Sequence, residues 1–583
     1  MKKIINDPTA VVREMCAGIV LAHPELTMDT KYKVIHKKNL NKSKVTLISG
    51  GGSGHEPAHA GFVGKGMLDA AVCGDVFASP SQIQVYQAIR QTASDSGTLL
   101  IIKNYSGDIM NFRNAAFLAQ EDGITVDYVK VDDDIAVKDS LYTVGRRGVA
   151  GTVFVHKIAG AAAEAGKSLS EVKAIAEKAA ANVKSIGFAL TSCTVPAKGT
   201  PTFDIGEGEM EYGVGIHGEP GIRREPTATA AELASRMVDA LSQELALTGS
   251  ERVALLVNGF GGTPLMELYL LNHQVTGELR KKGVTIARTF VGNYMTSIDM
   301  AGASVSILKL DGELEDLLNA PSSAPAFQVS GPVDAVAEMP DINPAAQAGE
   351  ANYGIETPAD YAAVSGGLSL QNVMYMVDAM CESAIRNEVP FCELDSHAGD
   401  GDFGMSIAKG FRQLKAEWKS IVAEQKDIAG FLNACSLVIM EHCGGASGPI
   451  WGSAFRAAAR SAKGKETLSV GDFAELMQAA VSGIQATGER SFGRGAVVGD
   501  KTLIDALVPC ADAWTESAKK NVSFKDAFDA GAEAAMAGAK STEKIAARMG
   551  RAGTVGERSI GWADAGAYGL AVIFGDVKNG LKF

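Results

Sequence analysis

The sequence changes character around a stretch rich in Pro, Ala, Ser and Gly, residues 320–358. This stretch has no convincing helical or strand periodicity, which is typical of a linker. Before it, short apolar runs alternate with helical patterns; after it, helical spacing dominates and strand candidates almost vanish. A chain of 583 residues is also too long for one hydrophobic core. We therefore expect a multidomain protein, with an α/β domain over residues 1–330, a linker over 331–358 and an all-helical domain over 359–583.

Six nearly continuous apolar runs in the N-terminal part are predicted to be strands. They are residues 44–49, 98–103, 126–131, 252–258, 284–290 and 304–310. Apolar residues at successive positions favour strands that helices cover on both faces. We expect two lobes, the second beginning near residue 200.

The charge balance and the cysteines limit the classes of partner. A formal net charge of −13 argues against a nucleic-acid or anionic-membrane surface as the main partner. No apolar run reaches the roughly 18 residues of a membrane-spanning helix, and acidic residues interrupt the start of the chain before a signal-peptide run develops. The eight cysteines contain no CxxC pair, which favours reduced thiols. We predict a cytoplasmic protein.

Two predicted strands are followed by residues that carry chemistry. The first runs into GGGSGHEPAHAG, residues 50–61, where glycines let a ligand approach the backbone, although a purely structural turn needs the same residues. His55 in this turn favours a site. The second ends in Lys103 and is followed by NYSGD, so in a parallel sheet Asp108 lies on the same rim and suits acid–base work on a hydroxyl. The alternative role for Asp108 is to cap the following helix.

Two further loops carry polar residues. GVGIHGEPG, residues 213–221, places His217 among four glycines. No neighbour in sequence covers the imidazole, so we expect an exposed ring, with a base or a metal ligand as the role that the residues alone favour. The three aspartates at 132–134 have no companion group in the sequence and are expected to form a solvated turn.

The helical part contains an acidic loop, CELDSHAGDGDFG, residues 392–404. Asp395, Asp400 and Asp402 repel one another unless a divalent cation is bound. The spacing is not that of an EF-hand, and open geometry beside glycines favours Mg²⁺ held jointly with nucleotide phosphates. His397 is not an expected ligand, since a hard cation prefers oxygen. An ordinary acidic surface loop is the alternative.

Two more segments suit phosphate. GGASGP, residues 444–449, leads into a helical pattern whose first N–H groups and Ser447 suit an anion, with tight packing of small residues as the alternative. GRAGTVGERSIGWADAG, residues 550–566, supplies Arg551, Arg558 and Asp564. Together these segments predict a Mg-nucleotide site without a Walker motif.

Six collinear motifs resemble the dihydroxyacetone (glycerone) kinase family. They are GGGSGHEPAHAGFVGKGML, IIKNYSGDIMNF, YGVGIHGEPGI, LDSHAGDGDFG, GGASGPIWG and GDKTLIDAL. The resemblance covers nearly the whole chain and is closest to the single-chain ATP-dependent type, in which a substrate-binding K domain and a nucleotide-binding L domain are fused through a linker.

The resemblance implies roles for individual residues. His217 matches the histidine whose Nε2 bonds to the substrate's carbonyl carbon as a hemiaminal, and His55 and Asp108 match the pair at the reacting hydroxyl, either of which is a candidate base. The matching substrate contacts are Gly52, Ser53, Gly54, His55, Lys103 and Asp108. The matching Mg²⁺ ligands are Asp395, Asp400 and Asp402. The matching nucleotide contacts are Phe403, Gly404, Met405, Ser406, Ser447, Gly448, Leu503, Arg551, Asp564, Ala565 and Gly566.

The implied function is ATP-dependent phosphorylation of dihydroxyacetone to dihydroxyacetone phosphate, with Mg²⁺ as cofactor and ATP as co-substrate. Kinase action on erythrulose or D-glyceraldehyde is an alternative, as is an FAD-AMP lyase (cyclising) side activity. A non-catalytic sensor is disfavoured because both sites look complete. Fusion of the two domains favours free ATP over a phosphotransferase relay, and the resemblance implies a homodimer.

Overall fold

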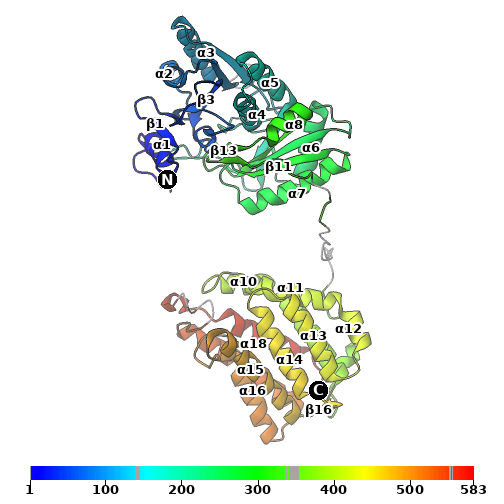
Figure 1. The fold of residues 1–583 in the computed structure, drawn as a ribbon. Coiled ribbons are helices and arrows are strands. Elements are labelled where there is room, and N and C mark those ends of the chain that lie inside the picture. Colours follow the sequence, from blue (N-terminus) through cyan, green and yellow to red (C-terminus); the bar gives the residue numbers. More distant parts are fainter. Residues whose placement is uncertain are drawn as a thin grey trace. The chain divides into compact units, whose positions relative to one another are not determined.

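In the computed structural model the chain divides into two compact units, Met1–Ile342 and Asn343–Phe583, here called the α/β unit and the helical unit (Figure 1). The structure describes residues 2–138, 145–219, 221–335, 338–340, 353–549, 553 and 556–583. The predicted fold class, an α/β region followed by an all-helical region, is confirmed. No helix in these described ranges is long and apolar enough to cross a membrane.

The α/β unit begins with a six-stranded sheet in the order β1-β2-β4-β3-β5-β6. Its strands are β1 (Leu26–Asp29), β2 (Val34–Lys37), β3 (Thr46–Ser53), β4 (Ala70–Val76), β5 (Thr98–Lys103) and β6 (Val126–Val131). Strands β4, β3, β5 and β6 run parallel, and β1 and β2 form an antiparallel edge. Because side chains alternate between the faces of a strand, Leu47 and Leu99 enter one hydrophobic layer and Ile48 and Leu100 the other.

Helices cover both faces of this first sheet, as the apolar runs predict (Figure 1). One layer consists of α2 (Gln82–Thr92) and α3 (Ser106–Glu121). The other consists of α1 (Val11–Ala22), α4 (Thr152–Glu164) and α5 (Leu169–Asn182), and the 3₁₀ turn η1 is Ala60–Phe62. Ser81 and Ser168 begin α2 and α5 with capping boxes, which satisfy the free N–H groups of the first turn.

The second sheet has the order β11-β10-β12-β7-β8-β9 and is mixed. Its strands are β7 (Val183–Ala189), β8 (Glu209–Tyr212), β9 (Arg223–Pro226), β10 (Arg252–Gly259), β11 (Thr285–Gly292) and β12 (Gly302–Leu310). The helices that follow in this half are α6 (Ala230–Glu244), α7 (Leu265–Lys281) and α8 (Gly312–Asn319). The second lobe therefore begins at β7, earlier than the expected position near residue 200.

The predicted linker composition begins inside folded structure. Strands β13 (Ser322–Ala324) and β14 (Phe327–Val329) pair as a hairpin, and Phe327 is buried in the core of the α/β unit. Small and proline residues at 320–329 therefore serve a tight hairpin rather than a linker. The predicted domain bounds of 1–330, 331–358 and 359–583 stay a prediction.

The helical unit packs its helices around one hydrophobic core (Figure 1). Its helices are α9 (Leu370–Arg386), α10 (Glu388–Asp395), α11 (Phe403–Ala416), α12 (Trp418–Glu424), α13 (Ile428–His442), α14 (Ser447–Ser461), α15 (Val470–Phe492), α16 (Ile504–Lys519), α17 (Phe524–Ser541) and α18 (Ala565–Gly580). Shorter elements are η2 (Ala359–Ala362), β15 (Leu368–Ser369), β16 (Thr467–Leu468), η3 (Thr542–Lys544) and η5 (Gly556–Ser559). Lys415 and Asp378 form a buried ion pair, 2.6 Å apart, that joins α11 to α9. Asp378 also accepts the backbone N–H groups of Glu356 and Thr357, which anchors the segment before α9.

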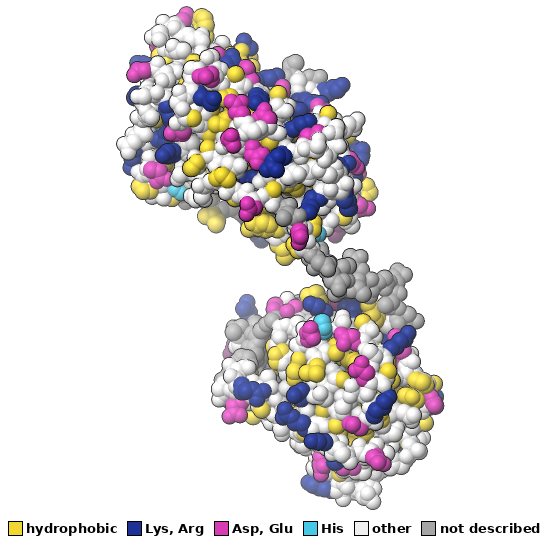
Figure 2. Space-filling model, turned by 45° about the vertical axis from the view of Figure 1, so that its right-hand side comes forward, with side chains coloured by type: hydrophobic (Ala, Val, Ile, Leu, Met, Phe, Trp, Pro, Cys, Tyr) yellow, Lys and Arg dark blue, Asp and Glu magenta, His cyan; other side chains and the backbone are white. Residues whose placement is uncertain are grey.

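Charged side chains of both signs are interspersed on the face that Figure 2 shows. The eight cysteines, all within the described part of the chain, are free thiols, as the sequence predicts.

Candidate active site

The parallel pairing of β3 with β5 brings two predicted site residues to one rim of the first sheet. His55 follows β3, and Asp108 lies in the first turn of α3, directly after β5. Asp108 is not the cap of α3, a position that Tyr105 takes. The carboxyl ends of parallel strands are where α/β proteins bind ligands.

Asp108 and Lys103 are buried at this rim, 3% and 1% exposed, and are close enough for each charge to act on the other. A Cβ atom on Gly51 would lie 3.4 Å from Lys103 Nζ and 3.5 Å from Asp108 Oδ2, so glycine lets both groups approach the backbone. Burial raises the pKa of Asp108, and the Lys103 charge and a hydrogen bond from Ser79 oppose that rise. Burial lowers the pKa of Lys103, and the Asp108 charge opposes that fall.

The His217 imidazole is not the exposed ring that its glycine neighbours predict. Its side chain is only 15% exposed. The rings of His55, Phe77 and Tyr105 surround it edge-on, with centroids 4.7, 5.1 and 4.7 Å away. The prediction was wrong because the covering rings come from distant segments, which the local sequence does not reveal.

His55 lies fully buried behind His217. Its Nδ1 is 2.8 Å from the Thr296 carbonyl oxygen, which only accepts, so Nδ1 carries the proton and a neutral ring has its lone pair on Nε2. That Nε2 is 3.1 Å from His217 Nε2. Burial, followed by the charges of Lys103 and His217, holds the pKa of His55 well below its usual value. A neutral His55 is thus placed to exchange a proton with His217.

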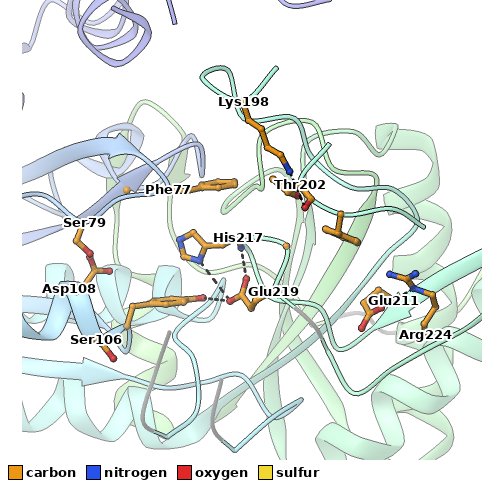
Figure 3. A pocket seen from close by; sticks show the side chains of 15 residues that line it. Phe77, Ser79, Ser106, Asp108, Lys198, Thr202, Glu211, His217, Glu219 and Arg224 are labelled. Atoms are coloured by element: carbon orange, nitrogen blue, oxygen red, sulfur yellow. Dashed lines mark hydrogen bonds and ion pairs between the residues drawn. The ribbon is translucent and has the colours of Figure 1, made fainter. Parts of the chain in front are cut away.

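His217 and Asp108 open into one cavity of about 1010 Å³ (Figure 3). The cavity is lined by Gly52, Phe77, Ser79, Tyr105, Ser106, Gly107, Asp108, Lys198, Thr202, Phe203, Glu211, His217, Gly218, Glu219 and Arg224. Figure 3 shows Ser79 and Asp108 on one side of His217, and Glu211 and Arg224 on the other. The cavity therefore offers a reacting end and a second, polar end.

The predicted substrate contacts divide into three groups. Gly52 and Asp108 line the cavity, as does the predicted covalent anchor His217, and His55 and Lys103 are buried beside it. Ser53 and Gly54 instead line a separate cavity of about 380 Å³. The lining residues Phe77, Ser79 and Thr202 were missed, since they lie outside the motifs. Tyr105 and Glu219 stand inside quoted motifs and could have been found as the polar neighbours of Asp108 and His217.

The three aspartates at 132–134 do not form the expected solvated turn. Asp133 and Asp134 are buried, and Asp134 pairs with Arg147 at 2.7 Å. Asp133 accepts the N–H groups of Val149 and Gly151. The companion groups are thus supplied by the segment that leads into α4.

In the helical unit the predicted acidic residues converge. One carboxylate oxygen from each of Asp395, Asp400 and Asp402 lies within 4.8 Å of the others. Burial raises the pKa of Asp395, and the charges of Asp400 and Asp402 add to that rise. An all-carboxylate donor set between α10 and the start of α11 fits a hard divalent cation such as Mg²⁺. His397 instead stacks on Trp562, with ring centroids 3.6 Å apart.

A cavity of about 200 Å³ adjoins this acidic cluster. Its wall includes the glycine turn Gly444–Gly445 and Ser447 at the start of α14, where N–H groups suit phosphate oxygens. Of the predicted nucleotide contacts, those in the wall are Phe403, Ser406, Ser447, Leu503, Asp564 and Gly566. Those near it but outside the wall are Gly404, Met405, Gly448 and Ala565. Arg551 lies outside the described residues.

Lys501 stands in the quoted motif GDKTLIDAL but was not predicted as a site residue, and it borders the same cavity. Its Nζ is 2.6–3.2 Å from the carbonyl oxygens of Thr542, Ile545, Ser559 and Trp562. Asp564 caps α18, and burial raises its pKa to about 7, with the nearby Asp505 charge adding to the rise. Lys501 therefore holds together the segment that delivers Asp564 to the cavity wall.

The two units thus offer complementary halves of one chemistry. In the helical unit, a carboxylate cluster suited to a divalent cation lies beside a helix N-terminus suited to phosphate. In the α/β unit, a carboxylate and two histidines lie at or beside a cavity large enough for a small molecule. This combination is that of a phosphotransferase with separate domains for the phosphate donor and the acceptor.

Comparison with known proteins agrees. The Dak1 domain model matches residues 17–326 and the DAK2 domain model matches residues 397–579. The chain belongs to the dihydroxyacetone kinase family.

Relatives and solved structures match along nearly the whole chain. The D-erythrulose kinase of Mycolicibacterium smegmatis is 35% identical over 98% of this chain and 97% of its own. The triokinase/FMN cyclase of Homo sapiens is 34% identical over 100% of this chain and 99% of its own. The crystal structure of the dihydroxyacetone kinase from C. freundii in complex with AMP-PNP and Mg²⁺ matches 99% of both chains with a TM-score of 0.60 and 31% identity.

Proposed function

We propose that this enzyme transfers the terminal phosphate of ATP to a hydroxyl of dihydroxyacetone, with the ketone held as a hemiaminal on His217. The observation that carries the proposal is the opening of His217 and Asp108 into one cavity, so that one imidazole and one carboxylate line the same space. A ketotriose offers little surface for binding, so a reversible bond to its carbonyl fixes its position and discriminates against glycerol, which has no carbonyl.

The covalent step needs His217 and a proton acceptor. His217 Nε2 adds to the carbonyl carbon, and the proton that stood between the two Nε2 atoms ends on the carbonyl oxygen, which becomes the hemiaminal hydroxyl. His55, 3.1 Å away and held in one tautomer by Thr296, is the group that passes this proton. No charge is created overall.

The transfer step needs a base at the acceptor hydroxyl. Asp108 is our choice for this base, because its carboxylate lines the cavity whereas His55 is buried against His217. Lys103 lies beside it and favours its ionised form. Held by His217 at the carbonyl, the neighbouring hydroxyl is positioned for deprotonation as the phosphate arrives.

We assign the phosphate donor to the helical unit. Asp395, Asp400 and Asp402 would hold Mg²⁺, which supplies neutralisation of phosphate charge when bound. The glycine turn before α14 and Ser447 would bind phosphate oxygens. The C. freundii enzyme, whose structure contains AMP-PNP and Mg²⁺, supports ATP and Mg²⁺ for this chain.

A four-carbon ketose such as erythrulose is the alternative substrate. The cavity continues past His217 to Glu211 and Arg224, and the relative from M. smegmatis is an erythrulose kinase. D-Glyceraldehyde kinase activity and a cyclising lyase activity on FAD are further alternatives, and their support is the name of the human and mouse relatives, triokinase/FMN cyclase.

We further propose a cytoplasmic homodimer in which the helical unit of one chain serves the α/β unit of the other. The eight free thiols support the compartment, and the resemblance to the family supports the dimer.

A coupled ATP assay over dihydroxyacetone, D- and L-erythrulose, D-glyceraldehyde and glycerol tests the function. We expect the ketones to be phosphorylated and glycerol not to be phosphorylated. Turnover of glycerol at a rate like that of the ketones would contradict the proposed hemiaminal.

Three variants test the assigned roles. His217→Ala should chiefly raise KM for the ketone, Asp108→Ala should chiefly lower kcat, and Asp400→Ala should abolish Mg-ATP-dependent turnover. Full activity of Asp400→Ala would remove the metal assignment.

A further inference from the structure

A buried carboxylate lies on the side of His217 opposite to His55. Glu219 is 3% exposed, and its Oε1 is 3.8 Å from His217 Nδ1. Its Oε2 accepts the backbone N–H of His217 at 2.8 Å. The carboxylate is therefore tied to the same loop as the imidazole, with Nδ1 toward it and Nε2 toward His55 and the cavity.

Groups from other segments hold Glu219 in this place. The Tyr105 hydroxyl donates to Oε1 at 3.4 Å, and Arg147 Nη1 lies 3.7 Å from the same oxygen. Arg147 is fully buried and is itself fixed by Asp134 at 2.7 Å and by the Gly213 carbonyl at 2.8 Å. Two carboxylates, one guanidinium and one imidazole thus form a continuous buried row that ends at the cavity.

The loop backbone is shaped around this carboxylate. A Cβ atom on Gly215 would lie 2.1 Å from Glu219 Oε1, so only glycine leaves room for the side chain to fold back beneath His217. Burial opposes ionisation of Glu219, but contact with His217 and the Arg147 charge outweigh it and lower its pKa to about 2. The residue is an anion across the working pH range.

The two sides of the imidazole are therefore chemically different. His55 has its proton on Nδ1, so it presents a lone pair to His217 Nε2. A carboxylate faces Nδ1 and favours a proton there. When the proton between the two Nε2 atoms is on His55 and Nδ1 of His217 keeps its own proton, the free lone pair of His217 is on Nε2. Nε2 is also the atom that faces the substrate carbonyl in the proposed step.

We propose that Glu219 is a positioning residue that fixes the orientation and tautomer of His217, keeping Nδ1–H toward the carboxylate and Nε2 toward the substrate carbonyl. The inference rests on the proposed hemiaminal. In that step the lone pair of His217 Nε2 forms the C–Nε2 bond and the carbonyl π bond breaks. The proton that His55 Nε2 has taken up passes to the carbonyl oxygen, and the Nδ1 proton stays on Nδ1. The single positive charge of the histidine pair thereby moves from His55 to the His217 ring, beside the Glu219 carboxylate. Glu219 touches neither the ketone nor the phosphate in this scheme.

The test uses the full-length chain, [2-¹³C]dihydroxyacetone and no nucleotide. In the wild type we expect the bound carbonyl carbon to give an sp³ resonance. Glu219→Gln, which keeps the shape and removes the charge, should lower the equilibrium constant of this adduct by about 10- to 100-fold, by analogy with the loss found when groups that orient metal-binding histidines are removed. Glu219→Asp should restore part of it. KM for the ketone should rise while KM for ATP stays unchanged.

A tautomer measurement separates positioning from mere support of the fold. In ¹⁵N-histidine-labelled protein, His217 should show a protonated Nδ1 in the wild type and lose that preference in Glu219→Gln. The matched control is Glu225→Gln, another carboxylate of this region held by Arg223 and Arg236 and absent from the cavity wall. It should leave both the adduct and the tautomer as in the wild type.

The outcomes are distinguishable. A wild-type sp³ signal that Glu219→Gln retains in full would overturn the role of Glu219. Absence of the signal from the wild type with every ketone would instead overturn the proposed covalent function. If Glu219→Gln does not fold, Tyr105→Phe is the alternative variant, because it removes one hydrogen-bond donor to Glu219 and keeps the Glu219 charge. Less adduct together with a weaker preference for protonated Nδ1 would support the proposal. An unchanged adduct and an unchanged tautomer would contradict it.

Discussion

Lys103 and Asp108 are almost fully buried, and the charge of each residue favours the ionised form of the other. Burial alone favours neutral forms, so the cation and the carboxylate depend on their proximity. Lys103 ends β5 and Asp108 lies in the first turn of α3, so the chain brings them close together. The pKa of Asp108 therefore depends directly on the charge of Lys103.

Replacing Lys103 with Met should therefore shift the acid limb of the pH–rate profile upward. Without the cation, the burial effect on Asp108 is unopposed by Lys103 and its pKa rises further, so a higher pH is needed to ionise the base. The measurement is kcat/KM for the ketone against pH. Lys130→Met, a half-exposed lysine on β6, is the control and should leave the limb in place. An unmoved limb in Lys103→Met would contradict Asp108 as the base.

Single residues differ in how far the sequence reveals them. His217 and Asp108 could be found because each stands next to a glycine, shortly after the end of a strand. Arg147 and the buried state of Asp134 could not, since an ion pair that joins separate segments leaves no local pattern. The exposure of His217 was misjudged for the same reason: Phe77 and Tyr105 cover it from two other segments.

At the scale of elements, helix α4 is packed entirely within the α/β unit and carries a buried histidine. His156 Nε2 lies 3.0 Å from Nδ1 of His59, which follows β3. Burial, with the Lys103 charge adding to it, lowers the pKa of His156 to about 3. The helix and the loop after β3 are thus joined by a contact that requires neutral imidazoles.

This pair should make the fold sensitive to acid. The unfolded chain takes up a proton on His156 near pH 6.5, whereas the folded chain does so only near pH 3. Stability is therefore full above pH 6.5 and falls as the pH drops, by about 2 kcal/mol between pH 7 and pH 5 from His156 alone. His156→Gln should flatten this slope in denaturant unfolding at the two pH values.

A control on the same helix is Phe154→Leu, which removes buried apolar contacts without removing a titrating group. It should destabilise the chain equally at both pH values and keep the wild-type slope. Equal slopes in His156→Gln and the wild type would show that His156 titrates alike in the folded and unfolded chain.

Predicted and observed elements agree best where the pattern is strong. The six predicted strands correspond to β3, β5, β6, β10, β11 and β12, whose apolar runs are nearly continuous in the sequence. The sequence did not reveal β1, β2, β8 and β9, which form the outermost two strands on one side of each sheet and have only four residues each. Strands β4 and β7 were missed because glycine interrupts their apolar runs, and the hairpin at 322–329 was hidden by linker-like composition.

For the whole molecule, the two-unit division could be expected from the change of texture along the chain, and the family from six motifs in a fixed order. What motifs do not encode is which chain's donor site meets which acceptor site. Phosphoryl transfer requires that the two sites come together, because the carboxylate cluster belongs to the helical unit and the cavity with His217 and Asp108 belongs to the α/β unit. The proposed dimer answers this with transfer between chains.

Mixing two inactive variants tests that transfer. His217→Ala impairs the acceptor site and Asp400→Asn the donor site, so each alone should be nearly inactive at low ketone concentration. If the helical unit of one chain serves the other chain, half of the randomly mixed dimers contain one intact pair of sites, and the mixture should recover about one quarter of wild-type activity. The activity is measured after unfolding and refolding the two variants together, with each refolded alone as the control. Recovery no greater than the sum of the separate variants would mean that transfer occurs within one chain.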